Sequence, residues 1–287
     1  MKTMPCESSP GANRMRILIL YFSATGNTAL IAHVLHKKFT GLGASVDEID
    51  ITPHSSRTAG MDLEPYDAVV FGFPVHSWRA PRMIREWLHT LDGRGKKCSL
   101  FFTYGGFGIH PAHESTRRIL AGQGFSVVSS AEFLSPHTFN LGGWNAMEDR
   151  PNPADLALAD DYATKTFQRF TGKDPGMMGE CEPTRYSEEE LDAIESFRFS
   201  VLTQLPSRNG NDCSGCRVCE AACPSGAMDA RSGNADPGRC IACLKCVTVC
   251  PDNALIINDM TASWERKLKM EQITEQGMHA KQSRIYL

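Results

Sequence analysis

Eight of the eleven cysteines lie between residues 213 and 250, where they form two copies of one pattern. In each copy three cysteines follow one another at a spacing of three, and the fourth is displaced by one residue and followed by proline. A shift of 27 residues places Cys213, Cys216, Cys219, Cys223 and Pro224 onto Cys240, Cys243, Cys246, Cys250 and Pro251. Tandem thiols at such short spacing indicate ligation of a soft metal rather than disulfide bonds. The sequence therefore predicts a small pseudo-symmetric metal module.

The run C-x2-C-x2-C-x3-C-P resembles the one by which bacterial two-cluster ferredoxins hold [4Fe-4S] clusters. The resemblance covers residues 209–258, the cysteine module, for which it implies a small α+β fold. Zinc is the alternative, but zinc ribbons use two cysteine pairs separated by a longer gap. The resemblance implies one cluster on Cys213, Cys216, Cys219 and Cys250, and a second on Cys240, Cys243, Cys246 and Cys223.

Apolar segments alternate with amphipathic ones between residues 16 and 172. Five segments predict strands, at 16–22, 46–51, 68–73, 98–104 and 125–133. Helices are predicted at 28–39, 81–91, 111–122 and 153–170. Several of the strands are apolar throughout, which is expected when helices cover both faces of a sheet. The pattern predicts an α/β fold with a doubly wound, five-stranded parallel sheet.

The stretch YFSATGNT (21–28) follows the first strand and opens the first helix. Backbone N–H groups at such a helix N-terminus favour a phosphate, but the loop has neither the lysine of a Walker motif nor a GxGxxG pattern. It resembles the phosphate loop of flavodoxins, which bind FMN at the carboxyl ends of strands ordered 2-1-3-4-5. The alternative is a merely polar turn. The resemblance implies phosphate contacts from the side chains of Ser23, Thr25, Asn27 and Thr28 and the backbone of Ala24 and Gly26.

Two further loops, after the third and fourth strands, are expected to border the flavin ring. Flat aromatic side chains there, Trp78 and Tyr104, are expected to cover the ring faces, and the glycines let the backbone approach the ring edge. The candidate residues of the two loops are Pro74, Val75, His76, Ser77 and Trp78, and Thr103, Tyr104, Gly105, Gly106, Phe107 and Gly108.

Four histidines, His76, His110, His113 and His137, fall in or beside loops at the predicted flavin edge. A histidine at this position is able to deliver a proton to a reduced substrate, because its unperturbed pKa is about 6.5. The alternative is that these are solvated loop residues. The long segment 135–153 is also a candidate functional loop, which would form a substrate pocket, dock the cysteine module or cover the sheet edge.

The rest of the chain gives a domain plan. Residues 1–14 are expected to be a disordered extension without a secretory signal, 15–172 the FMN-binding α/β domain, and 173–208 a linker with a helix at 187–205. The tail, 259–287, is expected to pack on the α/β domain or to mediate self-association into a homo-oligomer. A net charge of -3 does not favour nucleic acid, and the apolar runs are short of the ~20 residues that span a bilayer. We therefore expect a cytoplasmic protein.

The order of modules and both motif sets resemble the flavodoxin–ferredoxin fusion proteins of anaerobic bacteria and archaea. The resemblance implies an electron relay that couples the one-electron carriers of the cysteine module to two-electron flavin chemistry. No NAD(P)H fingerprint is present. One reading is a relay whose partners are redox proteins such as ferredoxin-type donors or acceptors. The other is an FMN-dependent reductase of a small organic acceptor, such as a quinone or an activated double bond, so whether the chain is an enzyme stays open.

Overall fold

The computed structural model describes residues 14–58, 60–179, 181, 184–197 and 203–287. The expected N-terminal extension therefore lies outside the described residues except for Arg14, as does part of the expected linker helix. Within the described residues, no helix is both long and apolar enough to cross a membrane.

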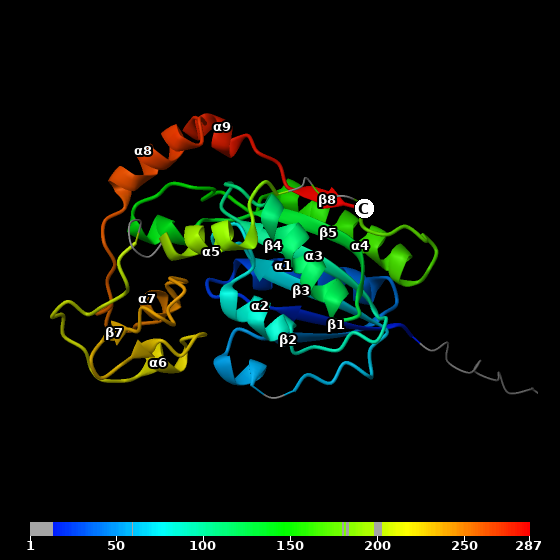
Figure 1. Ribbon diagram of the computed structural model, residues 1–287, viewed down its shortest axis with the longest axis horizontal. Helices are drawn as coiled ribbons and strands as arrows, with labels where there is room; N and C mark the ends of the chain where they lie inside the picture. Colours follow the sequence, from blue (N-terminus) through cyan, green and yellow to red (C-terminus); the bar gives the residue numbers. More distant parts are fainter. Residues whose placement is uncertain (1–13, 59, 180, 182–183, 198–202) are drawn as a thin grey trace, which may run out of the picture.

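A six-stranded sheet forms the centre of the α/β domain, with the order β2-β1-β3-β4-β5-β8 (Figure 1). Its first five strands are parallel and have the predicted 2-1-3-4-5 order. The sixth strand was not predicted: it comes from the C-terminal tail and pairs antiparallel with β5. The strands are β1 (Arg16–Tyr21), β2 (Ser45–Asp50), β3 (Ala68–Pro74), β4 (Lys97–Tyr104), β5 (Ser126–Leu134) and β8 (Arg284–Tyr286).

Helices cover both faces of this sheet. In β1, Ile17 and Ile19 pack into one apolar cluster and Leu18 and Leu20 into the other, because successive strand side chains point to opposite faces. The first cluster lies under α1 and α4, and the second under α2 and α3. These helices are α1 (Asn27–Gly41), α2 (Arg82–Leu88), α3 (His110–Gly122) and α4 (Pro153–Phe170), with short 3-10 turns η1 (His54–Arg57) and η2 (Thr138–Gly142).

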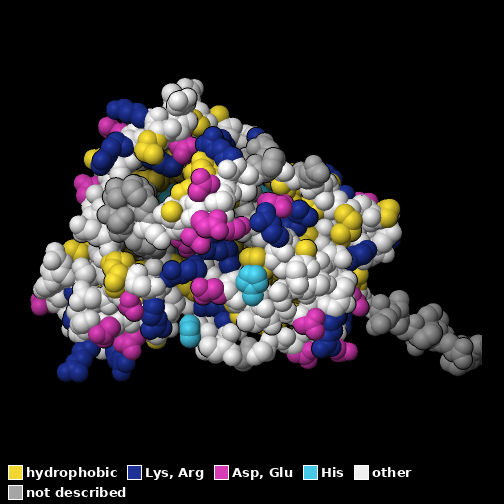
Figure 2. Space-filling view, in the orientation of Figure 1, with side chains coloured by type: hydrophobic (Ala, Val, Ile, Leu, Met, Phe, Trp, Pro, Cys, Tyr) yellow, Lys and Arg dark blue, Asp and Glu magenta, His cyan; other side chains and the backbone are white. Residues whose placement is uncertain are grey.

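The linker helix α5 (Glu188–Phe197) begins where the sequence predicts it to begin. The Ser187 hydroxyl accepts the Glu190 N–H at 3.2 Å, and the Glu190 carboxylate accepts the Ser187 N–H at 2.8 Å, which is a capping box. The expected end at residue 205 is wrong, because residues 203–205 are not helical. Acidic side chains gather over α5 in the middle of the face shown in Figure 2.

The cysteine module lies beside the carboxyl ends of the parallel strands, and the tail arches from it back to the sheet (Figure 1). The tail therefore packs on the α/β domain, as one of the two expectations proposed. The elements of the module are α6 (Val218–Ala221), β6 (Met228–Asp229), β7 (Asn234–Ala235) and α7 (Lys245–Thr248), and those of the tail before β8 are α8 (Thr261–Met270) and α9 (Glu275–His279).

Candidate functional site

A cavity of about 660 Å³ opens at the carboxyl ends of β1, β3 and β4. Ligands bind at this edge of a doubly wound sheet, where the strand order reverses between β1 and β3. Of the predicted cofactor residues, Ser23, Gly26 and Gly106 do not line the cavity. Those that line it are Ala24, Thr25, Asn27, Thr28, Pro74, Val75, His76, Ser77, Trp78, Thr103, Tyr104, Gly105, Phe107 and Gly108.

The loop before α1 contributes Ala24 and Thr25 to the cavity lining, and the start of α1 contributes Asn27 and Thr28. Gly26 has a φ of 96°, a conformation that glycine adopts without strain, and the N–H groups that begin α1 follow it. The Ser23 hydroxyl accepts the Ala29 N–H at 3.1 Å, and the Thr28 hydroxyl lies 2.8 Å from that of Thr103. The Asn27 amide donates to the Pro136 carbonyl at 3.3 Å. Three of the four side chains expected to hold a phosphate thus have protein partners, which favours backbone N–H groups and the exposed Thr25 for that role.

The loop after β3 folds into a tight turn. The His76 N–H donates to the Arg79 carbonyl at 2.8 Å, and the two residues between them, Ser77 and Trp78, have φ values of 47° and 69°. The Trp78 ring lies 4.9 Å from that of Tyr186, in the linker. Trp78 lines the cavity as expected of a ring-covering residue, but part of its surface packs on the linker.

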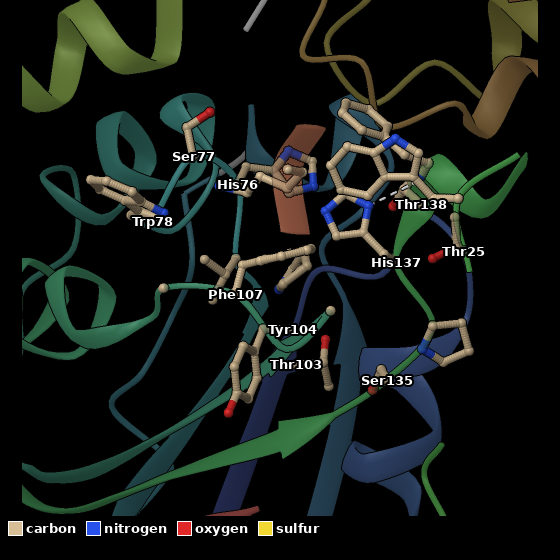
Figure 3. A pocket seen from close by; sticks show the side chains of 18 of the residues that line it. Thr25, His76, Ser77, Trp78, Thr103, Tyr104, Phe107, Ser135, His137 and Thr138 are labelled. Carbon is tan, nitrogen blue, oxygen red and sulfur yellow. Dashed lines mark hydrogen bonds between the residues drawn. The ribbon is translucent and has the colours of Figure 1, made fainter. Parts of the chain in front are cut away.

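The loop after β4 differs from the expectation at Tyr104. Its hydroxyl donates to the Glu132 carboxylate at 3.2 Å, its side chain is 9% exposed, and it belongs to the core of the sheet face under α2 and α3. Burial, with the Glu132 charge, raises the pKa of this phenol. Figure 3 shows Tyr104 pointing away from the middle of the cavity, where Phe107 projects instead. Tyr104 therefore lines the cavity while its hydroxyl is held in the core by Glu132.

An aromatic cluster that the sequence analysis missed lines the outer part of the cavity. Trp144 comes from the long loop and packs against His137 at 4.8 Å, Phe107 at 5.7 Å and Trp264 at 5.6 Å between ring centroids. Its indole N–H donates to the Ser263 hydroxyl of α8 at 2.8 Å. Segment 135–153 thus lines the cavity. It also contacts the tail just after the cysteine module, because the Gly142 carbonyl accepts the Met260 N–H at 2.7 Å.

The four histidines have separate environments. His76 and His137 line the cavity, whereas the side chain of His110 lies outside the described residues. His113 does not line the cavity, so the expectation of a solvated residue at the flavin edge is wrong for it: it is fully buried in α3, 2.7 Å from the Ser130 hydroxyl and 3.2 Å from the Glu132 carboxylate. His137 accepts the Phe139 N–H on Nδ1 at 3.0 Å, so in the neutral ring the proton is on Nε2.

The residues around the cavity fit FMN. The volume lies in the range of cofactor pockets, about 300–1,000 Å³. The start of α1 supplies N–H groups for a phosphate, and the Ser135 hydroxyl in the cavity wall is buried without a hydrogen-bond partner. A buried polar atom of this kind is a candidate for a bound group.

The two cysteine sets come together in the crossed arrangement that the resemblance implies. Cys213, Cys216 and Cys219 share a small cavity with Cys250 of the second repeat. In the other set, burial raises the pKa of Cys246, and the neighbouring thiols of Cys243, Cys240 and Cys223 raise it further. Four converging thiols are the donor set that an iron–sulfur cluster requires, so each set fits such a cluster.

The fold and the two sites define an electron-transfer flavoprotein built from two modules. A flavodoxin-domain family model matches residues 18–121, and a 4Fe-4S dicluster domain model matches residues 205–254. The chain is thus a flavodoxin domain fused to a 4Fe-4S dicluster domain, which implies FMN and [4Fe-4S] clusters as its cofactors.

Three solved structures illustrate what the α/β domain is similar to. A flavodoxin from the domain Archaea is 16% identical over 55% of this chain and 99% of its own, with a TM-score of 0.43. Oxidised flavodoxin 2 from Bacillus cereus is 20% identical over 55% and 99%, with a TM-score of 0.42. Rubredoxin oxygen:oxidoreductase from Desulfovibrio gigas is 18% identical over 55% and 36%, with a TM-score of 0.42. No curated protein matches the chain in sequence.

Proposed function

We propose that the protein relays electrons between two [4Fe-4S] clusters and FMN, and exchanges them with redox proteins at the exposed end of the cysteine module. The observation that carries this proposal is the different burial of the two cysteine sets. In the second set Cys240, Cys243 and Cys246 are 9%, 7% and 8% exposed and Cys223 is half-buried, whereas in the first set Cys216 is exposed and Cys213, Cys219 and Cys250 are half-buried.

The buried set belongs to the side of the module that packs on the α/β domain. Ile241, Cys243 and Leu244 join the same apolar core as the side chains of α2 and α3. The Arg57 guanidinium donates to the carbonyl of Pro224, next to Cys223, and Arg82 donates to the carbonyl of Gly238 at 2.8 Å. Contacts from both repeats therefore hold the second set against the domain that contains the FMN cavity.

This arrangement suits a relay. When bound, iron–sulfur clusters transfer single electrons and a flavin holds one or two, so their combination couples the two kinds of chemistry. The exposed set is accessible to an external protein, and the fixed packing of the buried set keeps one module at high effective concentration near the other. Electrons are expected to enter or leave at Cys213, Cys216, Cys219 and Cys250.

A specific observation favours a second candidate, the reduction of a small acceptor. The cavity extends beyond the three flavodoxin loops to Trp144, His137 and the side chains of α8, which supply a further wall. In this second function electrons still enter through the cysteine module, and a small molecule is their final acceptor.

The relay is tested on protein purified without oxygen, which should contain about one FMN and eight irons per chain. Oxidised protein is mixed with a chemically reduced ferredoxin, and bleaching of the flavin absorbance is followed by stopped flow. A Cys240→Ser variant should keep its FMN and its other cluster but receive electrons at the flavin at least ten-fold more slowly. Equal rates in the two proteins would show that the clusters are not on the route, and zinc in place of iron would overturn the proposal outright.

A further inference from the structure

The outer wall of the cavity comes from segments that are not flavodoxin loops. Helix α8 contributes Ser263, Arg266, Lys267 and Met270, and the long loop contributes Phe139 and Trp144. Hydrogen bonds hold this wall in place: Trp144 donates to Ser263, and the Asn145 amide donates to the Glu275 carboxylate at 2.6 Å. The wall is therefore a built part of the cavity that the FMN loops do not account for.

The charge of the cavity lining is one-sided. Among the described residues that line the cavity there is no aspartate or glutamate. Two cationic residues, Arg266 and Lys267, do line it. The Lys267 ammonium lies 4.9 Å from the centre of the Phe107 ring and 2.5 Å from the carboxylate of Glu271, which directly follows α8 and does not line the cavity. Lys267 is 18% exposed, so part of its charge is shielded from water.

Lys267 lies over the Phe107 ring rather than in the phosphate loop. Figure 3 shows Thr25, in the phosphate loop, on one side of the cavity and Trp78 on the other, with Phe107 between them. Lys267 covers Phe107, which belongs to the loop expected beside the flavin ring. Lys267 is therefore not part of the phosphate loop, and a second anionic group beside it would share its charge with Glu271.

The remaining surface of the wall is aromatic. The rings of His137 and Trp144 lie 4.8 Å apart at 32°, and Phe107 meets Trp144 edge-on at 5.7 Å. Faces and edges of this kind pack well on a planar conjugated molecule.

We propose that this wall is a second ligand subsite, beside the FMN position, for a planar conjugated carboxylate. Lys267 and Arg266 bind the carboxylate, and Phe107 and Trp144 contact the conjugated plane. The inference rests on the second candidate function, because an unsaturated acid of this class is a small acceptor that a flavin site is able to reduce. It assigns a ligand class to residues of α8 and the long loop.

The test is calorimetric titration of the oxidised, FMN- and iron-loaded protein with trans-cinnamate, cinnamamide and inorganic phosphate. Cinnamate should bind at least ten-fold more tightly than the neutral amide, which is about 1.4 kcal/mol, and phosphate should not bind measurably. Cinnamate should also perturb the visible absorbance of FMN. Absence of saturable cinnamate binding, or equal binding of acid and amide, would overturn the proposal.

Two variants locate the subsite. Lys267→Gln should remove most of the preference for the acid over the amide, and Lys267→Arg should retain it. Lys269→Gln is the matched control, because Lys269 is exposed on the same helix and does not line the cavity. An equal loss in Lys269→Gln would mean a general effect of charge and would contradict the subsite.

Failure of the subsite and failure of the proposed function give different results. The same preparations are assayed for FMN and iron content and for flavin reduction by ferredoxin. Normal reduction without cinnamate binding would reject only the subsite. Lack of FMN or of cluster-dependent reduction would reject the function on which it rests.

Discussion

In the first cysteine repeat Ser214 and Arg217 are exposed, whereas Ile241 and Leu244 at the same positions of the second repeat are 4% and 1% exposed. The backbone is the same at the matched pair, since Arg217 has a φ of 60° and Leu244 a φ of 56°. The two repeats thus have the same cysteine spacing and the same backbone conformation at this pair, and they differ in the residues between the cysteines. Those residues decide which set packs on the α/β domain, because burial of apolar side chains drives the contact.

The two repeats also exchange their fourth cysteines. The polar repeat contributes three thiols to the exposed set, and its fourth cysteine, Cys223, reaches the buried set. Each repeat therefore has a part in both environments. Substitutions in one repeat, or at the contacts of one repeat, test this difference.

The largest effect is expected from the displaced cysteines. Cys223→Ser should damage the set built on Cys240, Cys243 and Cys246, and Cys250→Ser should damage the set built on the first repeat. Each variant should lose about half of its iron, because a cluster with a missing thiolate ligand is weakly held. Iron content and electron paramagnetic resonance of the reduced proteins measure this loss.

The two variants are distinguished by the cluster that remains. Cys250→Ser should keep the buried cluster, which an external chelator removes slowly, and Cys223→Ser should keep the exposed one, which the chelator removes several-fold faster. If each replacement instead destroyed the cluster of its own repeat, the crossed arrangement would be wrong.

Much of the fold could be predicted from the sequence. The largely apolar segments predicted the parallel sheet, and the resemblance of the phosphate-loop motif to that of flavodoxins implied the order of its five strands; both signals are local. The sequence also contains a signal at Ile241 and Leu244, which replace the polar Ser214 and Arg217 of the first repeat. That difference would have identified the second repeat as the docking side.

Other features depend on contacts that no local pattern contains. β8 is three residues long and forms only because β5 offers a free edge to the tail. The orientation of Tyr104 depends on Glu132, 28 positions away, and the cavity wall at Trp144 depends on Ser263 of α8. Such long-range pairs are set by tertiary packing, which sequence periodicity does not reveal.

The next largest effect is expected from replacing the apolar residue at position 244 with the arginine found at the matched position 217. Leu244→Arg places a charge in the buried contact and should weaken docking of the module by at least about 2 kcal/mol, since loss of a buried leucine alone costs about 2–5 kcal/mol. The measurements are limited proteolysis of the linker and the rate of flavin reduction by reduced ferredoxin. Arg217→Leu is the control, and it should change neither. Unchanged proteolysis and rate in Leu244→Arg would show that the second repeat does not dock the module.

A smaller effect is expected at Arg57. Its guanidinium donates to the Pro224 carbonyl of the module and to the carbonyls of Ile51 and Thr52 in its own domain. Hydrogen bonds from a charged group contribute about 1.5–3 kcal/mol, so Arg57→Gln should slow flavin reduction and leave iron content unchanged. A slower rate together with loss of iron would instead indicate that Arg57 stabilises the cluster itself.

The smallest effect is expected at Arg82, which is exposed and makes a single 2.8 Å bond to the Gly238 carbonyl. Because solvent competes for such a bond, Arg82→Gln should weaken docking by no more than about 1 kcal/mol and change the flavin reduction rate by at most a few-fold. Arg94→Gln is the matched control, since Arg94 is an exposed arginine of the α/β domain paired only with Asp92 among the described salt bridges. If Arg82→Gln lowered the rate as much as Leu244→Arg, polar contacts rather than the apolar residues of the second repeat would determine which cysteine set faces the flavin cavity.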